Sequence, residues 1–219
     1  MNTKILTYLN DSALKAAFLA EIGKHEAADA LIKGTYGNMN GSFKGCAIGC
    51  SLYSLNRLQG KTGTALIAET DQHIRLEREL GWPVWLAYLE DHLFEQLPDD
   101  LSHTWPRRLS QAVPIGVIIS DAVLAKILRW SLADVTYGVS HATTDVKVRG
   151  YIDMVIAGFD AEIASEGHAM GDQRKAAARA AWDAWAARDA RDARDGFYPA
   201  LSEYVLAVLN ELDAARVQQ

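Results

Sequence analysis

Apolar residues that recur every three to four positions are the feature that most restricts the fold of this chain. The clearest run lies around Pro83, and its side chains are spaced as on one face of an α-helix: Trp82, Trp85, Leu86, Leu89, Leu93 and Leu97. Pro83 suits a first helical position, and Pro98 ends the run. The same spacing returns in most apolar segments, and no series of alternating strands is indicated. The sequence therefore predicts an all-α fold.

Helix-breaking residues divide the predicted helices. We expect Gly23, Gly81 and Gly196 to interrupt or end helices, because glycine is unfavourable inside them, and Pro106 to begin or kink a short one. The expected helices cover residues 12–22, 24–32, 45–58, 64–80, 83–97, 106–113, 121–130, 145–165, 173–195 and 199–212. Together they predict an irregular multi-helix bundle. Residues 1–165 would form the main domain, and residues 166–219 a C-terminal Ala-rich helical hairpin packed on it.

The Gly-rich segment from Gly34 to Cys50 stands apart from these helices. It holds both cysteines and five of the sixteen glycines. Glycine permits positive φ angles and close backbone approach, but it loses more conformational entropy on folding than other residues. A simple helix connection would need only about two to eight residues. The loop Gly34–Gly45 is therefore the predicted functional surface.

Cys46 and Cys50 would lie one turn apart on the same face of a helix. Three interpretations stay open: small buried side chains between helices, a nucleophilic or redox-active thiol at a helix N-terminus, or metal ligands. Two cysteines do not complete a zinc site, so histidines would have to join them, with His25 and His73 the nearest. We expect both thiols to remain reduced, because no export signal precedes them.

Histidine and acidic residues gather on three of the predicted helices. Facing helices in bundles build metal sites from such groups, although each group also fits a solvated helix face with ordinary ion pairs. Neither a matched pair of Glu-x-x-His motifs nor a full H-E-x-x-H motif is present. The groups are His25 with Asp29, then Glu69, His73 and Glu77, and finally Glu90, Asp91 and Glu95.

The candidate site collects the polar residues in and around the loop. Lys44 beside glycines could hold a phosphate, but the G-x-x-x-x-G-K-[ST] motif and a preceding strand are absent, which disfavours nucleotide binding. No G-x-S-x-G motif marks a serine nucleophile either. The candidate residues are His25, Asp29, Tyr36, Lys44, Cys46, Cys50, His73, Glu77, Glu90 and Asp91.

Charge and hydropathy exclude other classes of partner. The net charge of −6 argues against non-specific binding to nucleic acid or to an anionic membrane. The longest apolar stretches, Val113–Ile119 and Ala122–Leu128, are too short to span a bilayer. The sequence predicts a soluble, intracellular protein.

Three short motifs resemble those of one group of proteins. They are K-G-C-A-I-G-C-S at Lys44–Ser51, E-L-G-W-P at Glu79–Pro83 and L-E-D-H-L-F-E at Leu89–Glu95. The chain resembles phage and prophage proteins of uncharacterised function that carry G-C-A-V-G-C, L-G-I-P and L-E-D-x-x-F-E. It departs from them at Trp82, where they have Ile, and in its longer loop at Thr35–Phe43. The resemblance implies a helical phage protein in the cytoplasm of a bacterial host, and it implies no activity.

Two functions follow as expectations. The first is binding of a host protein, in an interaction or inhibitor role. The alternative is a metal-binding protein or enzyme with a Cys/His/carboxylate site beside the Gly34–Gly45 loop. The sequence leaves open whether the protein is an enzyme, which cofactor it holds and whether it forms homo-oligomers. The two expectations differ in whether the candidate residues converge in space.

Overall fold

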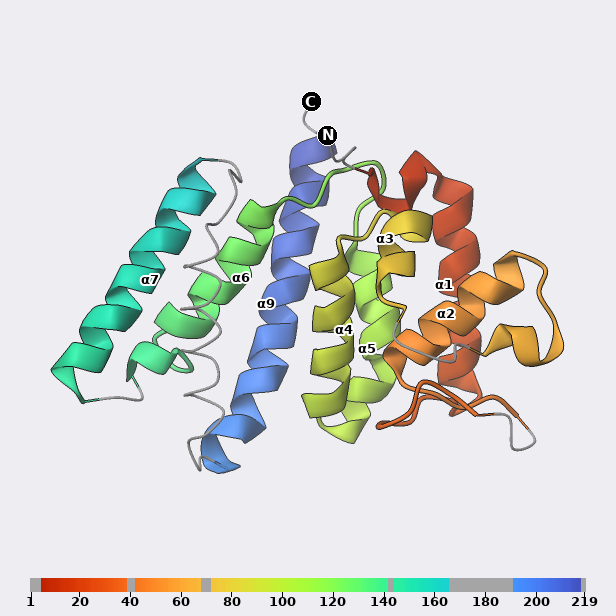
Figure 1. Ribbon diagram of the computed structural model, residues 1–219, viewed down its shortest axis with the longest axis horizontal. Coiled ribbons are helices and arrows are strands. Elements are labelled where there is room, and N and C mark those ends of the chain that lie inside the picture. Colours follow the sequence, from red (N-terminus) through yellow and green to blue (C-terminus); the bar gives the residue numbers. More distant parts are fainter. Residues whose placement is uncertain (1–4, 39–41, 68–71, 142–143, 166–190, 218–219) are drawn as a thin grey trace. The chain divides into compact units, whose positions relative to one another are not determined.

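The computed structural model shows an all-α protein, as the sequence predicts (Figure 1). It has eight α-helices and three 3-10 helices within its described part, where no β-strand occurs and only Leu31 with Gly45 and Asn38 with Lys44 form isolated bridges. The residues that the structure describes are 5–38, 42–67, 72–141, 144–165 and 191–217.

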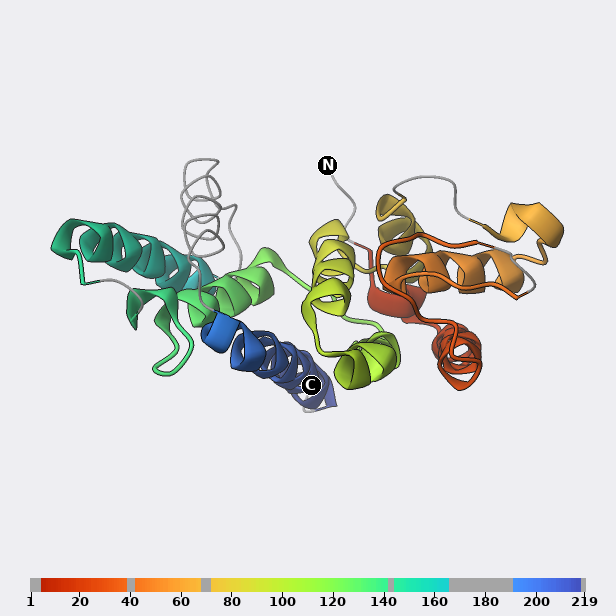
Figure 2. The ribbon, with the colours of Figure 1, turned by 90° about the horizontal axis from the view of Figure 1, so that it is seen from below.

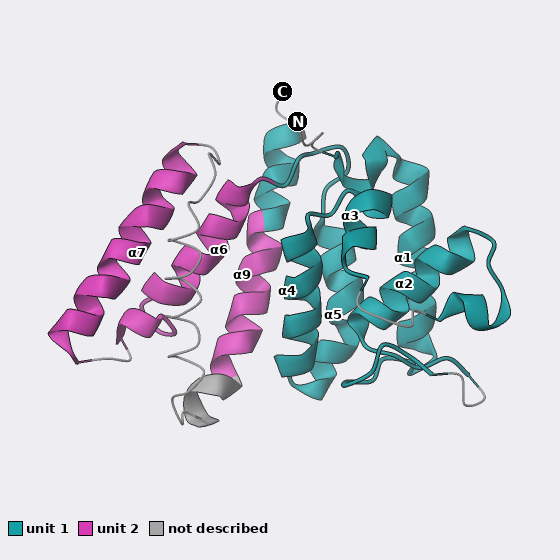
Figure 3. Cartoon of the chain, in the orientation of Figure 1, with its two compact units in different colours: residues 1–119, 209–219 teal, residues 120–208 magenta. Residues whose placement is uncertain are grey.

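The helices fall into two compact units, coloured separately in Figure 3. Residues 1–119 and 209–219 form the first unit, and residues 120–208 the second. The predicted boundary between residues 165 and 166 stays a prediction, because residues 166–190, which begin the predicted hairpin, lie outside the described part. The α-helices are α1 (Ser12–Ala27), α2 (Ala47–Leu58), α3 (Ile74–Leu80), α4 (Val84–Gln96), α5 (Asp99–Ala112), α6 (Asp121–Ala133), α7 (Val146–Ala164) and α9 (Arg191–Val217).

Several helix ends follow local sequence signals. The Asp11 carboxylate accepts a hydrogen bond from the Ala13 N–H at 2.7 Å and caps α1. Asp145 caps α7 in the same way, accepting from the N–H groups of Lys147 at 2.8 Å and Val148 at 3.3 Å. Gly81 ends α3 in the left-handed conformation, with φ 67°. The predicted starts of α1 and α7 and the predicted end of α3 are thereby confirmed.

The predicted helix limits at Gly23, Gly196 and Pro199 are wrong, and the helix that contains Pro106 begins earlier than predicted. Helix α1 continues through Gly23, α5 includes Pro106, and α9 includes both Gly196 and Pro199. One glycine costs a helix only about 1 kcal/mol relative to alanine, which the packing of the flanking turns outweighs. Helix α1 ends instead at Ala27, just before Asp29 turns into the left-handed region with φ 51°.

The single helix predicted for residues 64–80 is also wrong. A short 3-10 helix at Gly63–Leu66 ends where Ile67 is extended, with φ −87° and ψ 133°, and α3 begins only at Ile74. His73 therefore sits before the helix, and Glu69 lies outside the described residues. Arg75 fixes the start of α3 against α2, because its guanidinium donates to Asn56 Oδ1 at 2.9 Å.

Trp82 lies in the core of the first unit. Its ring meets the edges of Tyr8 and Phe18, with each pair of ring centroids 6.1 Å apart. The apolar run predicted on α4 is buried at Leu86 and Leu93, whereas Trp85 and Leu89 are only half-buried. The predicted face of α4 therefore does turn toward the core, but only part of the predicted apolar run is fully buried.

The second unit is built on α6 and α7, which lie side by side in both views (Figures 1 and 2). Ile152 and Phe159 of α7 pack with Ala125 and Leu132 of α6. On its other face, α6 presents Trp130, whose ring stacks on Tyr204 of α9 with centroids 5.2 Å apart. None of the described helices combines the length and the apolar character that crossing a bilayer requires.

Candidate metal site at the start of α2

The Gly-rich loop closes on itself immediately before α2. The Gly45 N–H donates to the Ala30 carbonyl and the Ile32 N–H to the Gly45 carbonyl, both at 2.9 Å. Cys46, which follows Gly45, is also bound to the loop, because its N–H donates to the Thr35 carbonyl at 2.6 Å. These backbone hydrogen bonds place Cys46 at a fixed point where the loop becomes a helix.

The glycines of the G-C-A-I-G-C motif allow this loop to cross the first turn of α2. A β-carbon at Gly49 would lie 1.9 Å from the Tyr36 carbonyl oxygen, and one at Gly45 would lie 2.9 Å from the same atom. Gly34, with φ 79°, turns the start of the loop, and its N–H donates to Glu95 Oε1 at 3.0 Å. The glycines of the motif are therefore needed because the loop backbone lies in close contact with the first turn of α2.

Both cysteines are buried free thiols. Cys46 is the N-cap of α2, where its Sγ accepts from the Gly49 N–H at 3.5 Å, and the Cys50 thiol donates to the Gly45 carbonyl at 3.5 Å. Burial raises the pKa of Cys46 to about 12 and that of Cys50 well above its ordinary value. Both thiols are thus protonated at neutral pH, which argues against the nucleophile interpretation.

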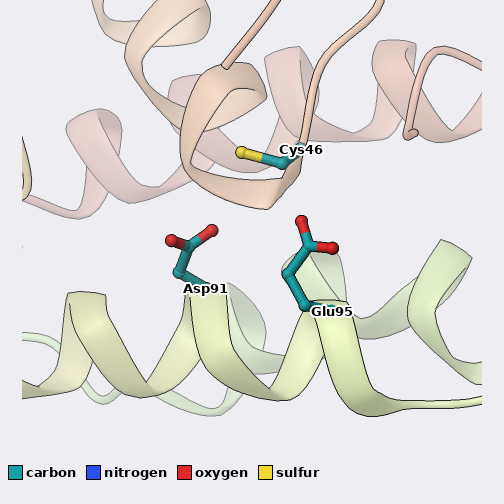
Figure 4. A group of neighbouring side chains, drawn as sticks. All are labelled: Cys46, Asp91 and Glu95. Atoms are coloured by element: carbon teal, nitrogen blue, oxygen red, sulfur yellow. The ribbon is translucent and has the colours of Figure 1, made fainter. Parts of the chain in front are cut away.

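Cys46 faces two carboxylates of α4 across a short gap (Figure 4). Its Sγ and one oxygen each of Asp91 and Glu95 lie within 4.8 Å of one another. Asp91 and Glu95 are four residues apart on α4, so they project toward the start of α2 from successive turns. The nearby Asp91 and Glu95 carboxylates add to the rise in the pKa of Cys46 that burial causes.

His73 meets this group at Asp91. Its Nε2 lies 3.4 Å from Asp91 Oδ2, and its side chain is only 2% exposed. The imidazole stacks on the Tyr88 ring, with centroids 4.1 Å apart and an angle of 17° between the planes. On another side it meets Tyr36 edge to face, with centroids 6.4 Å apart. The two tyrosines therefore flank the imidazole ring, whose Nε2 lies near Asp91.

Glu90 lies beside the group in the protein interior. It is fully buried, and its Oε1 accepts from the Ser51 hydroxyl at 3.3 Å, whereas its Oε2 has no hydrogen-bond partner among the described residues. Burial, and secondly the charge of Asp91, raise the pKa of Glu90 to about 8. Glu90 is therefore a neutral acid at neutral pH, and it contributes no negative charge to the site.

Four candidate residues are placed in other surroundings. The His25 ring meets both rings of the stacked pair Phe43 and Tyr53 edge to face, with centroid distances of 5.4 Å and 5.2 Å. Asp29 pairs with His103 at 3.3 Å, and its side chain is 84% exposed. Lys44 pairs through its backbone with Asn38, and the Glu77 carbonyl accepts from the Gly81 N–H at 2.9 Å. None of the four belongs to the group around Cys46.

Glu95 is the site residue that the candidate set lacks. The sequence groups it with Glu90 and Asp91, but only the position of α2 shows that Asp91 and Glu95, and not Glu90, face the cysteine. The available signal is the four-residue spacing of the two carboxylates, which the adjacent pair Glu90–Asp91 does not have.

A thiol, two carboxylates and a nearby imidazole form a donor set that suits Zn²⁺. Ligand bonds of about 2.0–2.3 Å place the donors of a tetrahedral ion roughly 3.3–3.8 Å apart. The observed limit of 4.8 Å exceeds this by at most about 1.5 Å, which small side-chain rotations remove.

No family model, curated protein or solved structure matches the chain, so the resemblance to phage proteins stays a prediction.

Proposed function

We propose that the protein binds a divalent transition-metal ion, Zn²⁺, through Cys46, Asp91 and Glu95. The observation that carries the proposal is the convergence of these three donor atoms within 4.8 Å. Cys46 lies at the start of α2, 45 residues before Asp91 on α4, so spacing along one helix does not explain their meeting.

The charges around the site favour a cation. Within the described part of the chain, neither Asp91 nor Glu95 pairs with a lysine or arginine. Two carboxylates that face each other beside a buried thiol repel one another, and a bound dication removes this repulsion. The sulfur donor favours zinc over magnesium or calcium, which prefer oxygen ligands alone.

The metal ion would join the loop, α2 and α4 at one point. The Gly34 N–H already holds Glu95, and the Thr35 carbonyl already holds Cys46, so the ion would connect segments that the loop positions. Because the unfolded chain lacks this arrangement, binding stabilises the folded state, by about 2.7 kcal/mol at a free metal concentration one hundred times the dissociation constant.

The test measures zinc content and thermal unfolding of the purified full chain after chelation and reloading. Wild type should take up one equivalent of Zn²⁺ and unfold at a higher temperature in its presence. Cys46→Ala, Asp91→Asn and Glu95→Gln should each lose or weaken that uptake. Cys50→Ala is the matched control for cysteine, because Cys50 is equally buried but lies outside the donor group, and Asp153→Asn is the control for an exposed carboxylate.

Two results would refute the proposal. One is a folded wild-type protein that takes up no zinc from excess metal, and the other is equal uptake by wild type, Cys46→Ala and Asp91→Asn. Circular dichroism of each variant distinguishes a lost ligand from a lost fold. Binding of a host protein, the first function expected from the sequence, stays a prediction.

A further inference from the structure

We infer that His73 is the fourth ligand of the metal ion, so that the site is closed and structural and has no open catalytic position. This inference rests on the proposed function. It extends the site to the segment that leads into α3, because His73 is the residue immediately before that helix.

The charge of the proposed ligands favours a neutral fourth donor. The Cys46 thiol would release its proton to solvent when it binds the ion, so a thiolate and two carboxylates would carry three negative charges against the two positive charges of Zn²⁺. The complex is therefore already negative, so it binds hydroxide weakly and does little to acidify a bound water molecule. A neutral imidazole completes the tetrahedron without adding charge, and the His73 imidazole is in contact with the proposed ligand Asp91.

The geometry of His73 suits this role. Its Nε2 lies 3.4 Å from Asp91 Oδ2, close to the separation of roughly 3.3 Å expected for nitrogen and oxygen donors on one zinc ion. His73 does not belong to the group whose atoms all lie within 4.8 Å of one another, so it would have to move toward Cys46 and Glu95 when the ion binds. Asp91 is the residue that links it to the other two.

The surroundings of the imidazole reduce the entropy lost on binding. The ring is stacked on Tyr88 and flanked by Tyr36, and His73 is almost completely buried. Its backbone is fixed too, because its carbonyl accepts from the Leu76 N–H at 3.0 Å in the first turn of α3. A side chain that is already ordered loses little freedom when it becomes a ligand.

A cobalt derivative of the full chain tests the inference, because Co²⁺ bound tetrahedrally absorbs visible light with an intensity that reports the number of ligands. His73→Ala should weaken Co²⁺ binding by more than about tenfold. Removing a residue that only hydrogen-bonds to a ligand already weakens metal binding by about tenfold or more, and loss of a ligand itself should have a larger effect. Free imidazole added to that variant should restore both the affinity and the wild-type spectrum. His103→Ala is the matched control, because His103 pairs with Asp29 away from the site.

The outcomes separate the two proposals. Wild type that binds neither zinc nor cobalt overturns the proposed function and this inference together. Wild type that binds metal, with His73→Ala showing the same affinity and spectrum and no response to imidazole, overturns this inference alone. If His73→Ala fails to fold, X-ray absorption of the zinc-loaded wild type decides the question. A spectrum with imidazole scattering supports the inference, and one without it overturns the inference.

Discussion

The carbonyl oxygen of Tyr36 lies 1.9 Å from the point where a β-carbon on Gly49 would be. The Gly-rich loop therefore rests directly on the first turn of α2, one turn beyond Cys46. Glycine at position 49 makes this approach sterically possible, although glycine is otherwise unfavourable in a helix. The loop and the helix consequently depend on each other for their positions.

The first prediction concerns this contact. Gly49→Ala should destabilise the protein by about 1–3 kcal/mol, because the added methyl group would push the Tyr36 backbone away from α2. Gly23→Ala is the matched control: a β-carbon at this position in α1 meets nothing within 4 Å, so the change should stabilise the helix by about 0.5–1 kcal/mol. Urea unfolding measures both. Equal stabilisation by the two alanines would show that the loop does not lie on α2.

The second prediction concerns stability in acid. Burial is the main cause that lowers the pKa of His25 to about 4, with Arg57 and Lys24 adding to the effect and Glu21 opposing it. Below its ordinary pKa of about 6.5 the unfolded chain takes up a proton at this residue, whereas the folded chain does so only near pH 4. The contribution of His25 to the free energy of unfolding is therefore fully present above about pH 6.5. As the pH falls from 6.5 to 4, the free energy of unfolding decreases by roughly 3 kcal/mol in total.

His25→Phe tests this prediction, because a phenyl ring can keep the edge-to-face contacts with Phe43 and Tyr53 and does not titrate. The free energy of unfolding of the variant should fall less than that of wild type between pH 6.5 and 4. His141→Phe is the control for the same substitution at an exposed histidine. Parallel profiles for wild type and His25→Phe would contradict the prediction.

The third prediction compares two leucines on α4. Leu93 is fully buried, so Leu93→Ala should cost about 2–5 kcal/mol through lost apolar contact and the cavity that remains. Leu89 is only half-buried, and Leu89→Ala should cost clearly less. Thermal or urea unfolding of both variants gives the comparison. A larger loss at Leu89 would mean that the helix is rotated relative to the described arrangement.

The sequence predicts the fold where a signal acts over one helical turn. Asp11 and Asp145 begin helices because their carboxylates satisfy free N–H groups, and Gly81 ends one because it adopts a positive φ angle. The predictions fail where a local preference is weaker than the packing of a long segment. Gly23 and Gly196 are examples, since each stays inside a helix, and Gly23 lies between the buried residues Ile22 and His25.

The candidate site is predictable in part for the same reason. The motif at Cys46 and the acidic residues of α4 are visible in the sequence, but the sequence does not show which faces of α2 and α4 meet. The four-residue spacing places Asp91 and Glu95 on one face of α4, but only the fold shows that this face meets Cys46, whereas Glu90 is buried as a neutral acid. His25 carries the same chemical group as His73, and its packing against Phe43 and Tyr53 depends on contacts that only the fold provides.

The pairing of Leu31 with Gly45 has a consequence for how this protein can change over evolution. The hydrogen bonds from Ile32 to Gly45 and from Gly45 to Ala30 close the base of the loop, and the bridge between Asn38 and Lys44 lies further from that base. Insertions or deletions between Asn38 and Phe43 therefore leave the base, and with it Cys46, in register. The sequence between these two residues can change in length and composition, whereas the buried Phe43 and the thiol that begins α2 keep their places.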